Sequence, residues 1–475
     1  MKKLRVIFLF LFMLIFEIQT PALTITHPEA HDLTVNEDAI FFTGKIERRE
    51  KVYINNELMT PSRARAFSYS VPLKKGENIF AVQKKDWLGN IETIKYTITR
   101  ASKSETKYKN EFIEAPKAYY KTIRDNVVLR NTPIDAGMNR LGYLPKDTEV
   151  VIDGTQNEFS RIYLTKDKYG WVMTKDLIKM PPETETAINE ETGEEITQEV
   201  FRYHPKTILS NEQTKNGDGK GIVVKLSKNT PYSAIIDRNK LVLTIYNLDT
   251  MSEVFTKEFS LGKFPRYSVK MQDSTLEVIF KKCPLNKSTY SNKDVKIVID
   301  PGHGGNEIGA VGCLGHREKT INLDVALRLK RILEFHHFDV YMTRETDKFV
   351  SLNERVEFAK EKDALIFISI HMNSVPISSN PNLNEGSIVF YYNPQSQQLA
   401  QAVVKVLSQE LDTKNGGAAQ ASFAVIRPTE YIGILAELAY LVNPNDVSIY
   451  KTKRFAHTSA VAIYKGLINY IHSSL

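Results

Sequence analysis

The chain has 475 residues, of which 42% are hydrophobic and 25% are charged, and its formal net charge is +7. This length exceeds what one hydrophobic core usually supports and predicts three or four domains, while the composition excludes a largely disordered chain. The modest positive charge favours an anionic partner surface. However, the sequence lacks the basic stripes with interleaved aromatic residues that are typical of nucleic-acid binding, so we expect no nucleic-acid partner.

The N-terminus has the pattern of an export signal. Three basic residues precede an unbroken apolar run from Val6 to Phe16, and Ala22 offers a cleavage point. The run is shorter than the roughly 20 residues that span a bilayer, but it fits the core of a signal peptide. We therefore predict a signal peptide over residues 1–22, with an uncleaved N-terminal anchor as the alternative. The expected location is the periplasm or the cell wall and extracellular space, without stable membrane insertion after cleavage.

Residues 23–100 contain short runs of alternating apolar and polar residues, separated by turn signals such as Asn55-Asn56. This pattern predicts a small β-sandwich, and it resembles the immunoglobulin-like modules of bacterial surface proteins. The clearest predicted strands are Ala39–Thr43, Lys51–Asn55, Phe67–Val71 and Asn78–Val82.

A charged and poorly patterned stretch, residues 101–117, is predicted to be a linker. Residues 118–180 contain another set of short strands, among them Asn126–Arg130 and Thr148–Ile152. The pieces "LRNTP" and "GWV" resemble a bacterial SH3-like barrel, a module that often binds wall peptides. Trp171, in the second piece, is either a core aromatic residue or a ligand contact.

Residues 181–199 are acidic and poor in apolar side chains, which predicts a solvated linker or a flexible hairpin. A third β-rich domain is predicted over residues 200–290, and its position ahead of the last domain resembles that of wall-targeting β-domains. The two cysteines, Cys283 and Cys313, are not in a metal-type spacing. We expect free thiols, although the sequence leaves their pairing open.

Residues 293–475 show a different periodicity, in which strand and helix patterns alternate. This alternation predicts an α/β domain with a largely parallel sheet that is flanked by helices on both faces, preceded by three small all-β domains. Functional sites in such sheets form beyond the carboxyl ends of the strands. The predicted strands are Val295–Ile299, Asp339–Met342, Ala364–Ile370, Ser387–Tyr392 and Ile434–Leu438, and one helix face carries Leu323, Ala326, Leu329 and Leu333.

Four polar residues fall where that rule expects a site. His303 follows the first strand, His371 ends the apolar strand, Glu437 emerges from a late strand, and Glu318 opens the first helix. Two imidazoles and a carboxylate around an open fourth position form a known catalytic zinc arrangement, and amide hydrolysis also needs a second carboxylate for proton transfer. Each residue alone has a structural explanation, such as favourable charge at a helix N-terminus for Glu318. An unpaired buried carboxylate at Glu437 is harder to explain structurally.

The motifs around these residues resemble the zinc-dependent N-acetylmuramoyl-L-alanine amidase family, in order and in spacing, from Val295 to about Leu467. The resemblance implies Zn²⁺ on His303, Glu318 and His371, with Glu437 as the catalytic residue. It also implies peptidoglycan as substrate, cut at the amide between the lactyl group of N-acetylmuramic acid and the L-alanine of the stem peptide. The matching motifs are "VIDPGHGG", "GHREKTINL", "TRETD", "SLNERVEFA", "FISIHMNS" and "AELAYLVNPND".

Some features leave alternatives open. His316 is a competing ligand to Glu318, and Tyr440 stands where the family usually has phenylalanine. The segment Ser374–Glu385 is too short for the helix that blocks the zinc in some relatives, so control is expected elsewhere, through wall or activator contacts of the β-domains. The rival functions are a zinc peptidase that acts within the stem peptide and an inactive wall-binding scaffold.

Overall fold

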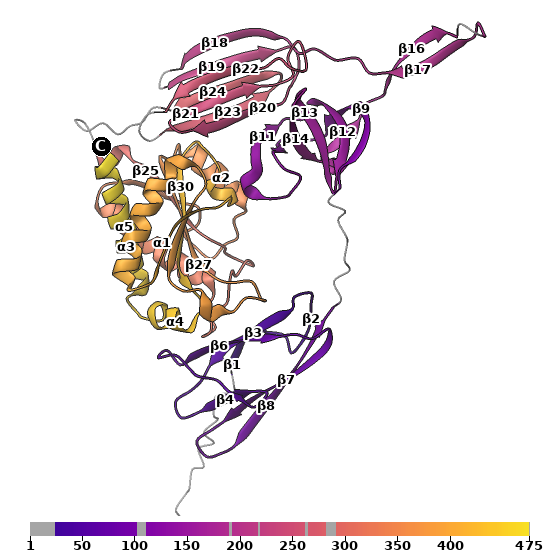
Figure 1. The fold of residues 1–475 in the computed structure, drawn as a ribbon. Coiled ribbons are helices and arrows are strands. Elements are labelled where there is room, and N and C mark those ends of the chain that lie inside the picture. Colours follow the sequence, from indigo (N-terminus) through magenta and orange to yellow (C-terminus); the bar gives the residue numbers. More distant parts are fainter. Residues whose placement is uncertain are drawn as a thin grey trace, which may run out of the picture.

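The computed structural model describes residues 24–101, 111–189, 192–216, 219–261, 265–281 and 291–474. The predicted signal peptide and Cys283 lie outside the described residues. Three β-rich units precede a C-terminal α/β domain, and a two-stranded hairpin projects between the second and third units (Figure 1). None of the helices in the described part of the chain has the length and apolar character needed to cross a membrane.

The first β unit, residues 24–100, is a sandwich of a three-stranded and a five-stranded sheet, which meet over buried side chains such as Phe42, Phe67 and Tyr96. Because side chains alternate along a strand, Phe67 and Val71 of β6 face this core, whereas Ser68 faces the other way. The sheets consist of β1 (Thr24–His27), β3 (Ala39–Lys45) and β6 (Ala66–Pro72), and of β2 (Asp32–Val35), β8 (Ile91–Arg100), β7 (Gly76–Lys85), β4 (Lys51–Ile54) and β5 (Glu57–Leu58).

The second β unit, residues 113–179, is one seven-stranded sheet around an apolar core to which Tyr246 of the third unit also contributes, and Trp171 is half-buried. Its first strand begins at Ile113, within the segment 101–117 for which a linker was predicted. Most side chains at the start of this strand are exposed, which removes the alternating pattern that would have revealed it. In sheet order the strands are β11 (Arg140–Leu144), β10 (Val127–Arg130), β14 (Lys168–Met173), β13 (Phe159–Thr165), β12 (Glu149–Gln156), β9 (Ile113–Thr122) and β15 (Leu177–Lys179).

Between the second and third units, the predicted acidic segment forms a hairpin, β16 (Glu183–Ile188) with β17 (Glu195–Val200). The third β unit, residues 208–281, then packs two antiparallel sheets over a common core. The immunoglobulin-like, SH3-like and wall-targeting assignments of the three units stay predictions. The sheets of the third unit are β18 (Ile208–Asn216), β19 (Gly219–Leu226), β24 (Thr275–Lys281) and β23 (Arg266–Gln272), and β20 (Tyr232–Asp237), β21 (Lys240–Ile245) and β22 (Phe255–Ser260).

The C-terminal domain is a six-stranded sheet with helices on both faces, which confirms the predicted fold class (Figure 1). Strands β26, β25, β27 and β30 are parallel to one another, whereas β28 and β29, which are parallel to each other, run in the opposite direction. The sheet order is β26 (Asp339–Met342), β25 (Lys296–Pro301), β27 (Ile366–Asn373), β30 (Ile432–Tyr440), β28 (Ser387–Tyr391) and β29 (Asn415–Gln420). The helices are α1 (Glu318–Phe335), α2 (Leu352–Glu361), α3 (Gln397–Leu411), α4 (Pro444–Tyr450) and α5 (Phe455–Ser474).

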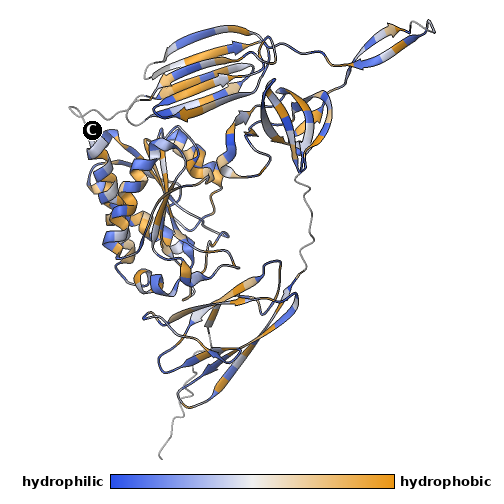
Figure 2. Ribbon diagram, in the orientation of Figure 1, coloured by the Kyte–Doolittle hydropathy of each residue, from blue (hydrophilic) through white to orange (hydrophobic). Residues whose placement is uncertain are grey.

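Apolar burial on both faces of the sheet explains why its central strands read as unbroken hydrophobic runs. In β25 every residue from Ile297 to Pro301 is buried, and in β27 every residue from Ile366 to Ile370 is buried. Figure 2 shows hydrophobic residues concentrated inside this domain, whereas hydrophobic and hydrophilic residues alternate along the strands of the β units. The carboxyl ends of β25, β27 and β30 therefore meet at one edge of a sheet whose two faces are buried.

The third β unit contacts the opposite edge of this sheet. Arg266 forms an ion pair of 3.2 Å with Asp363, and the main chains of Tyr267 and Thr429 are hydrogen-bonded. Asp363 and Thr429 precede β27 and β30, so this contact lies at the amino ends of the strands.

Truncating one buried residue of α1 tests this packing. Leu329→Ala should reduce the free energy of unfolding of the C-terminal domain by roughly 2–5 kcal/mol, because it leaves a cavity in a core where Leu329 is fully buried. Phe335→Ala, at the exposed end of the same helix, should change it by less than about 0.5 kcal/mol. Chemical denaturation followed by far-ultraviolet circular dichroism measures both changes in the free energy of unfolding. Equal effects of the two substitutions would contradict the assigned core.

Candidate metal centre

Three neighbouring strands position the predicted site residues. His303 follows β25, His371 lies on β27, and Glu437 lies on β30 directly opposite His371 in the strand register. The sequence placed His371 and Glu437 at strand ends, but β27 continues to Asn373 and β30 to Tyr440. Both residues therefore lie within paired strands, and the register between β27 and β30 shifts directly after them. Glu318 is the first residue of α1, as predicted.

His303, Glu318 and His371 bring one ligand atom each to within 4.8 Å of one another. His303 Nε2 lies 3.3 Å from Glu318 Oε2, and His371 Nδ1 lies 2.9 Å from Glu318 Oε1. His316, the competing ligand, lies outside this cluster, because its ring meets the ring of Tyr450 edge-on at 5.7 Å between centroids. The geometry favours Glu318 over His316.

The Glu318 carboxylate is held from several sides. Oε2 accepts a hydrogen bond of 2.8 Å from the Ala310 main chain, and Oε1 accepts bonds from the Met372 main chain and from Asn322. Burial acts to raise the pKa of Glu318, but the hydrogen bonds from His303 and His371 outweigh it and hold that pKa well below its usual value. The carboxylate is therefore ionised and oriented toward both imidazoles.

Glu437 lies beside this cluster in a different environment. Its side chain is buried, and Oε2 has no hydrogen-bond partner among the described residues. Burial raises the pKa of Glu437 to about 7, a shift that His371 opposes and Glu318 reinforces. A buried carboxyl with an unused oxygen is costly unless a ligand or a function needs it. A group with a pKa near neutrality is suited to accept and to return a proton.

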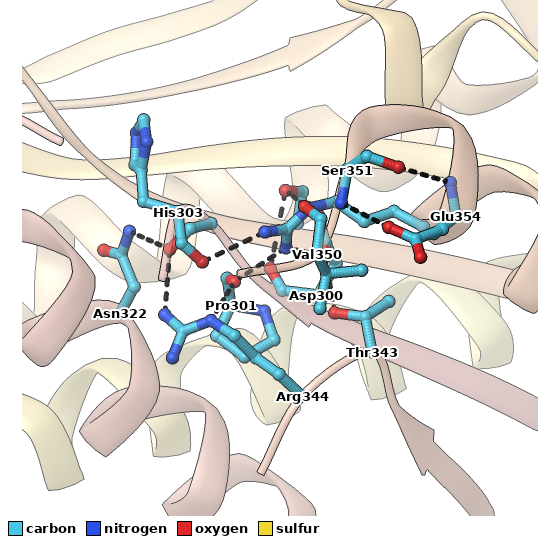
Figure 3. Close-up of polar contacts among 12 residues, drawn as sticks. Asp300, Pro301, His303, Asn322, Thr343, Arg344, Val350, Ser351 and Glu354 are labelled. Carbon is cyan, nitrogen blue, oxygen red and sulfur yellow. Dashed lines mark hydrogen bonds and ion pairs between the residues drawn. The ribbon is translucent and has the colours of Figure 1, made fainter. Parts of the chain in front are cut away.

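Two buried arginines organise the loop that carries His303. Arg344 donates to the carbonyl of Pro301 (Figure 3) and to that of Gly302, each at 2.9 Å. Arg355 donates to the carbonyl of His303 at 3.0 Å. A loop whose main-chain carbonyls are hydrogen-bonded to two guanidinium groups has few other backbone conformations available to it. The loop is therefore fixed through its main chain.

Asp300 balances this positive charge from the end of β25. Its Oδ1 accepts bonds of 2.6 Å from Arg355 and from Thr343, and its Oδ2 accepts one of 2.7 Å from Ser369. Asp300 and Arg355 are 1% and 2% exposed, so neither could be buried without the other.

Close approach of the backbone requires glycine at two positions around the cluster. A Cβ atom on Gly302 would lie 2.1 Å from the His371 ring, and one on Gly309 would lie 2.5 Å from Glu318 Oε2. His303 itself has a φ of 60°, a left-handed conformation that is unusual for residues other than glycine. The hydrogen bond from Arg355 to its carbonyl helps to hold this conformation.

The donor set fits a zinc ion. Two imidazole nitrogens and one carboxylate are the ligands of open catalytic zinc sites, and the buried carboxyl of Glu437 lies opposite one of these ligands, His371, in the strand register. The fold and the site together are typical of metal-dependent hydrolases.

Comparison with known proteins narrows this class. A profile of the N-acetylmuramoyl-L-alanine amidase family matches residues 297–469. The chain is 36% identical over 175 residues to the N-acetylmuramoyl-L-alanine amidase LytC of Bacillus subtilis, which covers 37% of this chain and 35% of LytC. It is 35% identical over 194 residues to the probable cell wall amidase LytH of Staphylococcus epidermidis, which covers 40% of this chain and 64% of LytH.

Among solved structures, the N-acetylmuramoyl-L-alanine amidase AmiC2 of Nostoc punctiforme is 36% identical, over 38% of this chain and 97% of its own, with a TM-score of 0.36. The C-terminal domain belongs to the N-acetylmuramoyl-L-alanine amidase family. The chain spans only about a third to two thirds of the length of LytC and LytH.

Sequence reasoning did not identify the residues that support the ligands. Arg344, Arg355 and Asn322 lie inside the motifs "TRETD", "SLNERVEFA" and "GHREKTINL", but no role was assigned to them. Their position within the matching motifs was the available signal. Their hydrogen bonds to residues far away in the sequence become visible only in the fold.

Removing the guanidinium fork of Arg355 tests the support of the His303 loop. Arg355→Lys keeps the charge beside Asp300 but cannot donate to the carbonyls of Pro301 and His303 together, so zinc affinity should fall about 10–100-fold. Competition against a chromophoric chelator measures this affinity. Arg331→Lys, at an exposed position on α1, is the matched control and should leave it unchanged. Equal affinities in a folded Arg355→Lys protein would contradict the assignment.

Proposed function

We propose that this protein is a zinc-dependent amidase that hydrolyses peptidoglycan at the amide between N-acetylmuramic acid and the L-alanine of the stem peptide. The observation that carries the proposal is the convergence of His303, Glu318 and His371 beside the buried carboxyl of Glu437. The family match to the domain that contains them supports this choice of substrate bond.

In this proposal His303, Glu318 and His371 hold the ion. When bound, zinc supplies a Lewis acid that polarises a carbonyl and lowers the pKa of water to about 7. The hydrogen bonds from Ala310, Met372 and Asn322 keep the Glu318 carboxylate in its orientation, and Arg344 and Arg355 keep the His303 loop in place. Pre-organised ligands of this kind lower the cost of ordering the site when the ion binds.

Glu437 moves the proton. As a carboxylate it accepts a proton from the attacking water, whose oxygen forms a bond to the lactyl carbonyl carbon. The bond between that carbon and the alanine nitrogen then breaks, and Glu437 returns the proton to the departing nitrogen. A nearby cation favours the carboxylate form of Glu437, which is the form that the first step needs.

The proposal also gives the protein a place and a substrate. Peptidoglycan lies outside the cytoplasm, in agreement with the expected export of the chain and with a cell wall amidase among its relatives. We assign the three β units to placement on the wall or on an activator. The immunoglobulin-like, SH3-like and wall-targeting resemblances support this assignment.

The proton transfer assigned to Glu437 has a direct test. Glu437→Gln should bind zinc with near wild-type affinity and release stem peptide from purified sacculi about 10²–10⁴-fold more slowly, because the amide cannot accept a proton. Glu357→Gln, at a position that is 72% exposed, is the control and should retain full activity. Peptide release by Glu437→Gln at the wild-type rate would exclude this role.

The metal requirement is tested by removal and return. A strong chelator should abolish peptide release by the wild-type protein, and stoichiometric Zn²⁺ should restore it. His303→Ala should remain inactive after the same addition, because it removes one of the three ligands. If chelated protein with no measurable zinc keeps its activity, the proposed chemistry is wrong.

A further inference from the structure

The first β unit lies against the edge of the C-terminal sheet where the site residues are found. In Figure 1, strand β6 of this unit lies near the end of the C-terminal domain where helix α4 is found. Strand β6 contacts both α4 and the short helix η4 (Pro381–Leu383). The third β unit, by contrast, contacts the opposite edge through Arg266 and Tyr267.

Ser68, on the face of β6 that points away from the sandwich core, makes polar contacts with three segments of the C-terminal domain. Its hydroxyl donates a hydrogen bond of 2.7 Å to the carbonyl of Val442 and lies 3.7 Å from the Sγ of Cys313. Its own carbonyl accepts a bond of 3.0 Å from the side chain of Asn382. Serine is small enough to let the main chains approach this closely.

The first β unit and the C-terminal domain each pack apolar side chains into the core of the other. Ala64 and Ala66 of the first β unit, 4% and 0% exposed, are buried in the hydrophobic core of the C-terminal domain. In return, Ile377 of the C-terminal domain packs against the core of the β-sandwich. The two folding units therefore share buried surface, which a flexible tether would not require.

Each of the three contacted segments is joined to a site residue. Cys313 lies in the loop that leads into Glu318, Ile377 and Asn382 lie in the loop that follows His371, and Val442 follows Glu437 at the end of β30. The loop after His371 has only the three-residue η4 as regular structure. Loops with so little structure of their own open at low free-energy cost unless other contacts hold them.

We propose that the first β unit forms one fixed side of the reaction site, in which Ser68 is a positioning residue that braces the loop leading into Glu318 and the segments that follow His371 and Glu437. This inference rests on the proposed function for what the loops surround, but the brace itself is a statement about structure. It assigns the first β unit a role in positioning the loops of the site, in addition to the proposed role in placing the protein on the cell wall.

A disulfide tests the docked arrangement and its effect together. In a Cys283→Ser background, Ser68→Cys places a second thiol beside Cys313, where the native Oγ and Sγ atoms are 3.7 Å apart. Mild oxidation should remove both free thiols, as measured in the denatured protein. Ser70→Cys, two residues along the same face of β6, is the control and should keep its thiols.

The oxidised Ser68→Cys protein should release peptide from sacculi with a kcat/KM within about twofold of its reduced form, because a fixed side of the site does not need to move. Failure to form the disulfide would overturn the docked arrangement. A disulfide that abolishes activity until it is reduced would also overturn the proposal, because the unit would then be a cap that must leave.

A bulky side chain in place of Ser68 allows a measurement that does not depend on catalysis. Ser68→Arg should raise amide hydrogen exchange in residues 374–385 and 441–446 by at least about tenfold and should lower kcat/KM. Thr93→Arg adds the same charge at an exposed position of the unit and should change neither. Unchanged exchange in Ser68→Arg would refute the brace.

The outcomes also separate the brace from the proposed function. If even the wild-type protein releases no peptide, the amidase proposal fails, while the disulfide and the exchange data still decide whether Ser68 braces the loops.

Discussion

The buried carboxylate of Glu318 is the interaction on which the rest of the site depends. Charge in a dry interior is stable only when opposite charge and hydrogen bonds surround it, and Glu318 meets this condition by bonding to both imidazoles, to Asn322 and to two main-chain amides. These bonds come from β27, from α1 itself and from the stretch between β25 and α1. Satisfying this one group therefore brings β27, the start of α1 and the loop after β25 to a common point, which is a three-ligand cluster.

A second group of buried charged residues, at the end of β25 and around the His303 loop, supports that cluster. Asp300, Arg344 and Arg355 are almost fully buried. Asp300 accepts a hydrogen bond from Arg355, and both arginines donate to main-chain carbonyls in and next to the His303 loop. Removing one member of such a network costs about 3–5 kcal/mol, because the remaining charge is left without a partner. Stability and site geometry are thus coupled, since the polar bonds that hold the His303 loop also hold the end of β25.

Sequence reasoning reached the parts of this architecture that depend on local pattern. The apolar runs of β25 and β27 and the motifs around His303, Glu318, His371 and Glu437 were sufficient to predict the α/β domain and its candidate site. It failed where long-range contacts decide. The roles of Arg344 and Arg355 depend on carbonyls distant in the chain, and β9 begins with exposed side chains at Ile113. Ser68, a small polar residue, carries no local sign that another domain covers it.

The β units hold the C-terminal domain at both edges of its sheet, with the first unit at the reaction site and the third at the far end. The central claim is that the site cleaves the bond between glycan and peptide. Mass spectrometry of purified sacculi digested by the full chain tests it most directly. We expect glycan strands without peptide, together with stem peptides that begin at a free L-alanine. Products in which L-alanine remains attached to N-acetylmuramic acid and the stem is cut internally would contradict it.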